Sequence, residues 1–418
     1  MKKICILGLG YIGLPTAAMF ATHGHKIIGV DKNTTVIDLI NQGEVHIDEP
    51  YLDIMVQAAI RSGNMLSQTE PDYADVFIIA VPTPITNRKC ADLTDVRAAT
   101  EAIIPYLQSG NIVILESTVP PKTVQDVMIP ILEKSGLKLG EEIFMAYSPE
   151  RVMPGKILLE LVENNRIIGG INHKSAELVG DLYKTFVRGE VILTDATTAE
   201  MVKLIENSYR DINIAFANEV ALICESLGIN GWNVIDFANK HPRVNVLSPS
   251  PGVGGHCIAV DPWFIIEAAG KLSQLIKTSR KINDHMPSFV ANKVENILSS
   301  VEGSKVVTIL GITYKANVDD MRESPILELV DLLKSKNCGI RVVDPHIKEH
   351  DYLFKDIYKA VQNSDLLLLG VNHFEFRHLD FKKIYKLMRN KYILDTRNYW
   401  SSEDLQEIGF ISFLLGKG

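Results

Sequence analysis

The residue with the most reactive side chain in an informative setting is Cys257, in the stretch PGVGGHCIAVDP (251–262), four residues before Asp261. A cysteine there can be a small buried hydrophobic residue, a metal ligand or a nucleophile. His256 and Asp261 alone do not complete a ligand set, so no metal is expected. Three glycines precede the cysteine, at a cost in chain entropy that we interpret as room for a substrate to approach.

A second set of residues points to a bound dinucleotide. The stretch KICILGLGYIG predicts a buried strand over 3–7, followed by Gly8-x-Gly10-x-x-Gly13 at the start of a helix over about 14–22. Such glycines permit a tight turn, close approach of a pyrophosphate and close helix–strand packing, although glycine-rich turns also occur without ligands. Asp31 ends the next strand, where a carboxylate accepts from a ribose diol and repels a 2′-phosphate. NAD is therefore expected rather than NADP.

A thiol and NAD together have a specific use. The thiolate can add to an aldehyde to give a thiohemiacetal, which a hydride acceptor oxidises to a thioester and water converts to an acid. Two other classes stay open on the residues alone. One is a one-step NAD alcohol dehydrogenase in which Cys257 is structural, and the other is a non-catalytic protein that binds its ligands without reducing NAD.

Composition fits this interpretation. A chain of 418 residues with 46% apolar residues indicates two or three domains. Its five cysteines are scattered and odd in number, which favours a reducing cytosol over a disulfide framework. The formal net charge of −8 disfavours binding to nucleic acid or to an anionic membrane. The apolar amino-terminal run resembles a signal peptide, but its glycines and Pro15 favour a β-turn-α unit.

Further strands are expected to end at the ligand-binding edge of the same sheet. They are DVFIIAVPTP (75–84), NIVILESTVP (111–120) and EIFMAYSPERVMPG (142–155). Thr83 and Thr118 at two of these ends are candidate cofactor contacts or helix caps. Glu150 and Arg151 lie at the end of the third.

The second half combines helices with another strand series. Residues 197–227 lack proline and glycine and predict one long helix, on which Lys203, Asn207 and Arg210 share a stripe. That stripe is either a solvated charged face or part of a site, and the apolar neighbours of Lys203 favour the site. More helix is expected to about residue 300. A strand-turn-helix series then starts at KVVTILGITYK (305–315) without a GxGxxG motif, so a nucleotide held through Lys315 and Arg322 is expected there.

The predicted fold is α/β, with two doubly wound Rossmann-like domains joined by a central helical region. The predicted domains are 1–196 for NAD binding, 197–300 for the helical connection and 301–418 for binding a nucleotide.

The chain resembles the UDP-glucose/GDP-mannose dehydrogenase family, which oxidises the C6 alcohol of a nucleotide sugar to a carboxylate with two NAD. The resemblance rests on GLGYIGLP, AVPTP, ESTVP, SPERVMPG, AEMVKLIENSYRD, GVGGHCIAVDP and YKANVDDMRESP, which occur in the family's order over essentially the whole chain. Within the family, GGHC, Trp263-Phe264 and HPRVN (241–245) are similar to the branch that oxidises UDP-N-acetyl-D-mannosamine. UDP-N-acetylglucosamine and UDP-glucose are the alternative substrates.

The resemblance implies residue roles. Cys257 is the expected nucleophile, and Lys203, with Asn207 beside it, is the expected acid/base or oxyanion partner, whose cation would favour the thiolate. Asp261 and Glu150, with Thr118 and water, are the expected proton-handling groups. The expected sugar-nucleotide contacts are Arg151, Val152, Lys203, Asn207, Arg210, His241, Arg243, Gly254, Tyr314 and Lys315. The expected cofactor contacts are Gly8, Gly10, Tyr11, Ile12, Gly13, Asp31, Thr83, Thr118 and Arg322.

The resemblance also implies that 197–300 is a dimerisation region and that 301–418 binds the UDP-sugar. A homodimer or larger homo-oligomer would be built on the long helix, with the HPR stretch (241–243) reaching the site of a neighbouring subunit. A cytoplasmic enzyme that supplies precursors for surface polysaccharide is expected.

Overall fold

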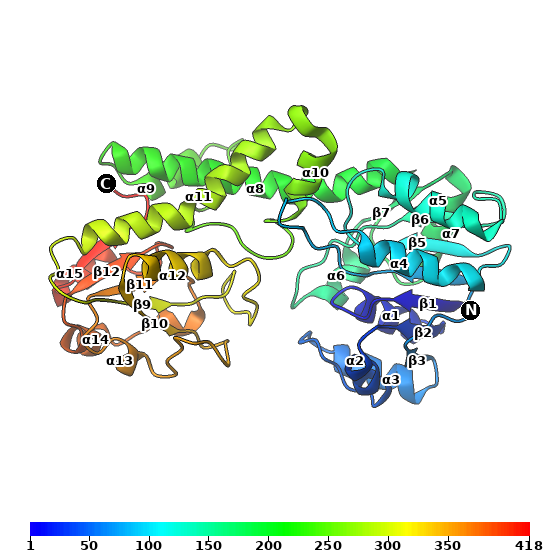
Figure 1. Cartoon of the computed structure of the whole chain (residues 1–418), viewed down its shortest axis with the longest axis horizontal. Helices are drawn as coiled ribbons and strands as arrows, with labels where there is room; N and C mark the ends of the chain where they lie inside the picture. The colour runs from blue at the N-terminus through cyan, green and yellow to red at the C-terminus, as the bar shows by residue number, and fades with distance from the viewer. The chain divides into compact units, whose positions relative to one another are not determined.

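The computed structural model describes all residues, 1–418, which divide into two compact units (Figure 1). The first unit comprises residues 1–206 and 263–270, and the second comprises 207–262 and 271–418. The predicted division into three domains at 196 and 300 stays a prediction.

The first unit contains an eight-stranded sheet in the order β3-β2-β1-β4-β5-β6-β7-β8. Its strands are β1 (Lys3–Leu7), β2 (Lys26–Val30), β3 (Met65–Gln68), β4 (Val76–Ile79), β5 (Ile112–Leu115), β6 (Phe144–Tyr147), β7 (Arg166–Gly170) and β8 (Val191–Asp195). Neighbours from β3 to β6 pair in parallel, whereas β7 runs antiparallel to β6 and pairs in parallel with β8. The order of the first six strands is that of a dinucleotide-binding sheet.

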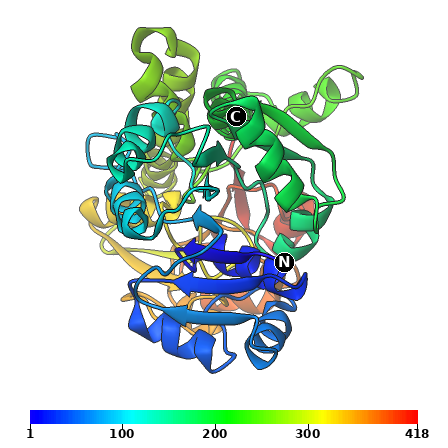
Figure 2. The ribbon, with the colours of Figure 1, turned by 90° about the vertical axis from the view of Figure 1, so that its right-hand side faces the viewer.

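Helices of the first unit connect these strands, and β1–β3 with α1–α3 form the blue part of the ribbon (Figure 2). The helices are α1 (Gly13–Thr22), α2 (Thr34–Asn41), α3 (Leu52–Arg61), α4 (Thr94–Ile103), α5 (Ile129–Leu132), α6 (Ile157–Glu163) and α7 (His173–Tyr183). Short 3-10 turns cover Ile104–Tyr106 and Glu133–Ser135, and a π-helical turn covers Val124–Met128. Two apolar cores result because strand residues alternate between the faces: Ile4 and Ile6 join one core, and Cys5 and Leu7 the other.

The second unit contains a five-stranded, all-parallel sheet in the order β10-β9-β11-β12-β13. Its strands are β9 (Lys305–Leu310), β10 (Cys338–Val343), β11 (Leu366–Leu369), β12 (Tyr392–Asp395) and β13 (Ile411–Leu414). The helices that follow β9 along the chain are α12 (Pro325–Ser335), α13 (Ile357–Ala360), α14 (Phe381–Leu387) and α15 (Ser402–Ile408), with a 3-10 turn at Phe374–Phe376. The predicted pair of Rossmann-like sheets is confirmed.

The helical region that separates the two sheets in the sequence begins with one long helix, as predicted. Its helices are α8 (Ala196–Ser226), α9 (Gly231–Ala238), α10 (Asp261–Ala269) and α11 (Gln274–Ile297), with a 3-10 turn at Gly270–Leu272. Residues 239–260, which include HPRVN and the glycines before Cys257, are turns and irregular chain rather than helix. None of the helices combines the length and the apolar character needed to cross a membrane.

Candidate active site

The turn after β1 fits the pyrophosphate of a dinucleotide. Gly8 has a φ of 92°, and a Cβ there would lie 2.6 Å from the carbonyl oxygen of Ala80. A Cβ on Gly13 would lie 1.8 Å from the carbonyl oxygen of Gly8, whereas the Cβ position of Gly10 has no atom within 4 Å. Helix α1 has no acidic residue in its first turn and no side-chain cap. The turn therefore leaves open the side from which an anion would meet the helix N-terminus.

Asp31 is held at the end of β2 by backbone groups. Its Oδ2 accepts from the N–H of Leu9 at 3.0 Å, and its Oδ1 accepts from the N–H of Asn33 at 2.9 Å. The half-buried carboxylate keeps further lone pairs, which suit a ribose diol. Tyr11 and Ile12 lie in the same turn as Gly10, one exposed and the other half-buried.

Cofactor choice should depend on this carboxylate. We expect wild-type enzyme to prefer NAD to NADP in kcat/KM, and Asp31→Asn to narrow that preference by roughly tenfold, since removing one charge near a phosphate changes the interaction by about 1–2 kcal/mol. Steady-state kinetics with both cofactors measure this. Asp95→Asn, which removes a carboxylate ion-paired with Lys32, is the matched control. Equal kcat/KM for the two cofactors in wild-type enzyme would contradict the assignment.

Thr83 and Thr118 are brought together by the loops after β4 and β5. The Thr83 hydroxyl donates to the carbonyl oxygen of Thr118 at 2.5 Å, and the Ser117 hydroxyl donates to the carbonyl oxygen of Val81 at 2.7 Å. Neither threonine caps a helix, because α4 and the π-helical turn begin after Leu93 and Thr123. The capping alternative is therefore wrong, and a cofactor contact stays a proposal.

A buried carboxylate on α8 fixes the loop that carries Thr118. Glu200 is fully buried and accepts from the backbone N–H groups of Lys122 at 2.5 Å and Val124 at 2.8 Å. Burial without a cationic partner raises the pKa of Glu200 to about 7. The native state therefore binds this proton more tightly than the unfolded chain does.

That raised pKa predicts a pH effect on stability. Between the ordinary Glu pKa and about 7, the native state holds more protons at Glu200 than the unfolded state, so this group's contribution falls as pH rises through the window. Lowering pH from 7.5 to 5.5 should stabilise wild-type protein relative to Glu200→Gln by roughly 1–2 kcal/mol. Urea unfolding of both proteins at the two pH values measures the difference. Parallel stability–pH curves would count against this role.

Lys203 is half-buried and hydrogen-bonded rather than part of a solvated face. Its half-buried side chain donates from Nζ to the carbonyl oxygen of Glu150 at 2.7 Å. The carboxylate of Glu150 has other partners: it accepts from the guanidinium of Arg166 at 2.6 Å and from the N–H of Arg151 at 2.9 Å. Glu150 thus contacts Lys203 through its main chain.

A buried charge cluster holds Glu150 in place. Arg166 is fully enclosed, donates to Glu150 and, at 2.7 Å, to Glu116, and stacks on the ring of Tyr183 at 3.8 Å. The Tyr183 hydroxyl donates to Glu116 at 2.5 Å. Burial, opposed by Arg166, raises the pKa of Glu116 to about 7. Two carboxylates and one guanidinium therefore fix the chain that presents its carbonyl to Lys203.

Cys257 lies in a turn directly before α10. Its carbonyl oxygen accepts from the N–H groups of Val260 at 3.0 Å and Asp261 at 2.8 Å, and its side chain is half-buried. By contrast, Cys5 and Cys224 are buried, and burial raises the pKa of Cys5 to about 12. Cys257 is thus not a core residue of the kind that Cys5 is.

The glycines before Cys257 have a packing role. A Cβ on Gly254 would lie 2.4 Å from the carbonyl oxygen of Glu323, and a Cβ on Gly255 would lie 2.8 Å from the ring of Tyr314. The N–H of Gly255 also donates to the carbonyl oxygen of Arg322 at 3.1 Å. Close packing of two loops within the second unit therefore explains these glycines without the substrate approach that their sequence predicts.

Charges gather around this pair of loops. Burial lowers the pKa of the half-buried Lys315, and Arg210 lowers it further, whereas Asp320 and Cys257 raise it. Cys257 is thus within electrostatic reach of Lys315, and a cation there favours the thiolate. Arg322 is engaged by Asp320 at 2.6 Å and remains about half exposed.

Asp261 and Asn207 are paired in the second unit. The amide of Asn207 on α8 donates to Oδ2 of Asp261 at 2.6 Å, and Asp261 is buried as the first residue of α10. A fixed carboxylate four residues after the thiol can hold a water molecule or accept a proton.

The other expected sugar-nucleotide contacts lie in two places. Arg151 pairs with Glu206 at 2.8 Å, and the adjacent Val152 packs on an apolar core of the first unit. His241 and Arg243 are exposed after α9 in the second unit, and Arg243 forms no ion pair within the chain.

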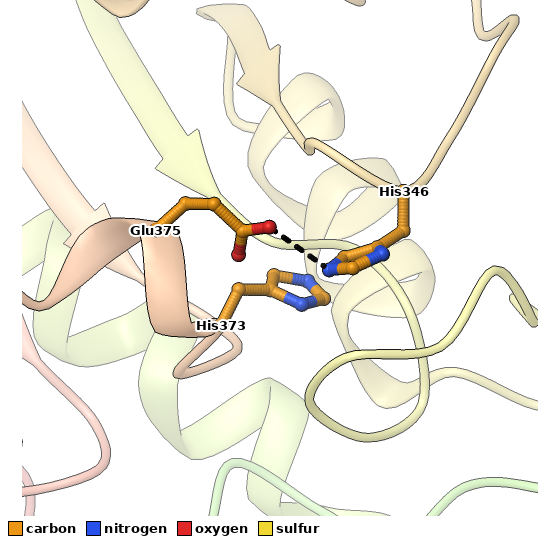
Figure 3. Close-up of side chains that lie close together, drawn as sticks. All are labelled: His346, His373 and Glu375. Atoms are coloured by element: carbon orange, nitrogen blue, oxygen red, sulfur yellow. Dashed lines mark ion pairs between the residues drawn. The ribbon is translucent and has the colours of Figure 1, made fainter. Parts of the chain in front are cut away.

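Two histidines and a glutamate in the second unit lie close enough together to be compared with a metal site. The ligand atoms of His346, His373 and Glu375 lie within 4.8 Å of one another (Figure 3). However, Nδ1 of His373 accepts from a backbone N–H at 2.9 Å and Nε2 lies 3.2 Å from the carboxylate of Asp344, so both ring nitrogens are engaged. The remaining two side chains do not form a closed ligand set. A nearby cavity of about 270 Å³, lined in part by Asp344 and Glu375, contains none of the expected site residues.

Comparison with known proteins decides the family. The family models for the UDP-glucose/GDP-mannose dehydrogenase family match in sequence as the NAD binding domain over residues 2–187, the central domain over 197–285 and the UDP binding domain over 308–402. The chain belongs to the UDP-glucose/GDP-mannose dehydrogenase family. The predicted resemblance, the cofactor NAD and the predicted class, an NAD-dependent nucleotide-sugar dehydrogenase, are confirmed.

Individual relatives cover the whole chain. A UDP-N-acetyl-D-mannosamine dehydrogenase of Methanococcus vannielii is 46% identical and covers 100% of this chain and 98% of its own. An NDP-N-acetyl-D-galactosaminuronic acid dehydrogenase of Ralstonia solanacearum is 45% identical over 97% of each. The solved structure of the UDP-D-ManNAc dehydrogenase of Pyrococcus horikoshii matches with a TM-score of 0.94 and 40% identity over 100% of this chain and 99% of that one.

The sequence does not predict that three arginines are buried or half-buried in this family member. Arg166 is a lone cation in an apolar strand, which was the available signal. Arg280 binds Asp211 at 2.6 Å inside the second unit, 69 residues apart in sequence. Arg397 follows β12 and donates to the carbonyl oxygen of Gly370 at 3.0 Å, and burial lowers its pKa to about 10. Arg397 is half-buried at the carboxyl edge of a parallel sheet, where such sheets bind anionic ligands.

Proposed function

We propose that this dehydrogenase oxidises the C6 alcohol of UDP-N-acetyl-D-mannosamine to the carboxylate of UDP-N-acetyl-D-mannosaminuronate. The carrying observation is the half-buried Cys257 within electrostatic reach of Lys315, in a loop that leads to the buried Asp261 at the start of α10. Relatives with the corresponding names and 45–47% identity support the sugar assignment, as do GGHC and HPRVN.

The proposed reaction consumes one water and two NAD. The C6 alcohol loses a hydride and a proton to give an aldehyde, and the Cys257 thiolate adds to that aldehyde to form a thiohemiacetal. A second hydride and proton leave to give a thioester, and water then cleaves the carbon–sulfur bond, which releases the carboxylate and restores the thiol. NAD, which the Gly8–Gly13 turn and Asp31 would hold, would supply the hydride acceptor for both oxidations.

The chain's own residues are proposed to handle binding and protons. Lys203, which donates to the Glu150 carbonyl, stabilises the negative charge that develops on the aldehyde oxygen when the thiolate adds, with Asn207 beside it. Asp261 and Glu150, with Thr118 and water, handle the protons of alcohol oxidation and thioester hydrolysis. Sugar-nucleotide contacts are proposed for Arg151, Val152, Arg210, His241, Arg243, Gly254, Tyr314 and Lys315. Cofactor contacts are proposed for Gly8, Gly10, Tyr11, Ile12, Gly13, Asp31, Thr83, Thr118 and Arg322.

Substrate identity is tested by NADH production from a panel of sugar nucleotides. The panel contains UDP-N-acetylmannosamine, UDP-N-acetylglucosamine, UDP-N-acetylgalactosamine, UDP-glucose and GDP-mannose. The highest kcat/KM is expected for UDP-N-acetylmannosamine. A preference of roughly tenfold or more for another member would overturn the substrate assignment, and for UDP-N-acetylgalactosamine it would indicate the specificity that the Ralstonia relative's name suggests.

A homodimer is proposed through an apolar face of α8 in the second unit. Tyr209, Phe216 and Ile223 on α8 and Leu227 directly after it are 51–67% exposed and recur at spacings of seven and four. A continuous apolar helix face of this length is unusual on a monomer and suits a second copy of the chain.

Light scattering of the purified chain tests this assembly. Wild-type protein should have the mass of a dimer or a larger oligomer, and Phe216→Glu should dissociate because it places a charge in the interface. Glu219→Gln, on the same helix, is the control. A monomeric wild-type chain at tens of micromolar would contradict the proposal.

A cytoplasmic location and a role in supplying precursors of surface polysaccharide are proposed with this activity. The product carries a carboxylate on an activated sugar, which suits a glycosyl transfer that follows.

A further inference from the structure

The second sheet repeats the ligand-binding turn of the first. The N–H of Gly8 donates to the carbonyl oxygen of Val30, the last residue of β2, at 2.8 Å. The N–H of Gly311 donates to that of Val343, the last residue of β10, also at 2.8 Å. The next N–H in each turn donates to a carboxylate, that of Asp31 at 3.0 Å or that of Asp344 at 2.8 Å. Asp344 therefore occupies the position that binds a ribose in a dinucleotide-binding sheet.

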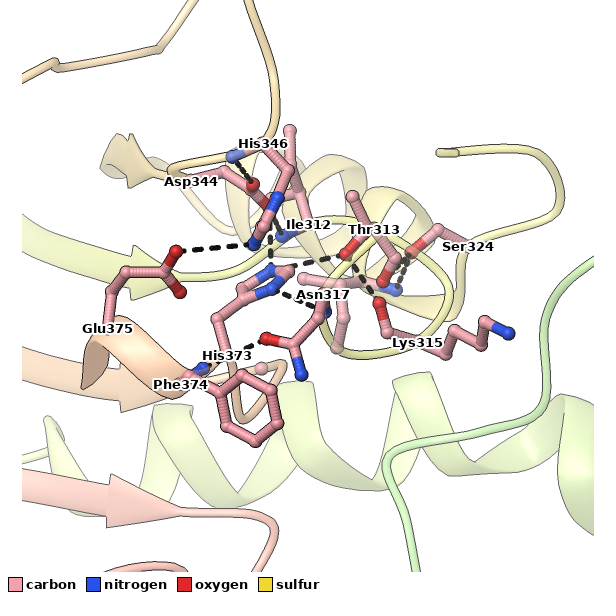
Figure 4. Close-up of polar contacts among 12 residues, drawn as sticks. Ile312, Thr313, Lys315, Asn317, Ser324, Asp344, His346, His373, Phe374 and Glu375 are labelled. Atoms are coloured by element: carbon pink, nitrogen blue, oxygen red, sulfur yellow. Dashed lines mark hydrogen bonds and ion pairs between the residues drawn. The ribbon is translucent and has the colours of Figure 1, made fainter. Parts of the chain in front are cut away.

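In the second sheet this carboxylate binds a histidine from the same unit instead. His373 is fully buried, and its Nε2 lies 3.2 Å from Oδ2 of Asp344 and 3.2 Å from the hydroxyl of Thr313 (Figure 4). Its Nδ1 accepts from the N–H of Asn317 at 2.9 Å. Since Nδ1 is an acceptor, the proton lies on Nε2 and is shared between the carboxylate and the hydroxyl.

These contacts fix the chain on both sides of Lys315. The Thr313 hydroxyl donates to the carbonyl oxygen of Lys315 at 2.9 Å. Asn317 has a φ of 60°, and its side-chain oxygen accepts from the N–H of Phe374, next to His373, at 3.0 Å. The residue between Thr313 and Lys315 is Tyr314, whose ring packs over Gly255.

We propose that His373 is a positioning residue for the sugar nucleotide, because it holds the 313–317 loop in the shape that presents Lys315. The inference rests on the proposed role of Lys315. The histidine does not touch the ligand. Its Nε2 donates to Thr313, which precedes Lys315, and its Nδ1 accepts from the N–H of Asn317, which follows it.

Three substitutions distinguish the donor role of His373 from its acceptor role. His373→Asn keeps an acceptor near the Nδ1 position, His373→Gln keeps a donor near the Nε2 position, and His373→Phe keeps a ring but neither group. We expect His373→Phe to raise the KM for the UDP-sugar and the Kd for UDP by roughly tenfold, with intermediate values for the other two. The KM for NAD should not change, and kcat should change less than the KM for the sugar.

His346→Phe is the matched control. The ring centroid of His346 lies 4.7 Å from that of His373, but His346 makes no hydrogen bond to the 313–317 loop. UDP binding is measured by calorimetry on the full chain, with Lys315→Met and the double variant Lys315→Met/His373→Phe. If His373 acts through Lys315, the double variant should bind UDP no more weakly than Lys315→Met.

The outcomes are distinguishable. Unchanged UDP binding in Lys315→Met would remove the proposed role of Lys315 and the inference with it. Weaker binding in Lys315→Met but wild-type binding in folded His373→Phe would overturn the inference alone, as would additive losses in the double variant. If His373→Phe does not fold, the Asn and Gln variants decide by the same readout.

Discussion

Replacement of Cys257 by serine should abolish steady formation of the acid while UDP-sugar binding survives. A hydroxyl is hardly ionised at neutral pH, and an ester forms and hydrolyses more slowly than a thioester, so kcat should fall by at least ~10³-fold. Cys257→Ala should lose the second oxidation without unfolding, because the half-buried thiol contributes little packing. NADH formation and calorimetric UDP binding measure the two properties separately.

Cys90→Ser is the matched control for that experiment. Cys90 is also half-buried, and its thiol donates only weakly to the carbonyl oxygen of Arg88 at 3.7 Å. Its replacement should leave kcat within about twofold of wild type. Full activity in Cys257→Ala would show that the cysteine is structural.

Loss of the Lys203 ammonium should have the second largest effect. Lys203→Met keeps the length of the side chain but removes the only group that donates to the Glu150 carbonyl from α8, so kcat should fall by ~10²–10⁴-fold. UDP affinity should fall far less than kcat. Lys203→Arg should also be impaired, since a planar guanidinium does not reproduce a point charge held at 2.7 Å.

Lys240→Met provides the comparison for a lysine that pairs on the surface. Its ammonium lies 3.1 Å from Asp236 on α9 and is largely exposed, so its loss should leave kcat unchanged. If Lys203→Met retained more than about a tenth of wild-type kcat, the role proposed for Lys203 would be wrong.

Local motifs explain why much of the fold could be predicted. The strand Lys3–Leu7, the glycine turn and the long helix from about residue 197 agree with the structure, because apolar runs, glycines and the absence of helix breakers act over a few residues. The same holds for the sheet-edge positions of Asp31 and Thr118.

Contacts between distant segments could not be predicted. Arg166 contacts Glu116, 50 residues earlier, and His373 contacts Thr313, 60 residues earlier, and the sequence does not show these contacts. The sequence predicts that the glycines before Cys257 leave room for a substrate, because nothing in it shows that Tyr314 and Glu323 pack against them. Residue type identified the reactive groups, whereas the groups that hold them depend on the tertiary fold.

The most direct test of the covalent mechanism is the number of NADH formed per UDP-sugar consumed by wild-type enzyme, with intact-protein mass spectrometry after a rapid acid quench. Two NADH per sugar, no released aldehyde and a sugar-nucleotide adduct that maps to Cys257 are expected. One NADH per sugar with accumulating aldehyde and no adduct would contradict the mechanism and support a one-step alcohol dehydrogenase.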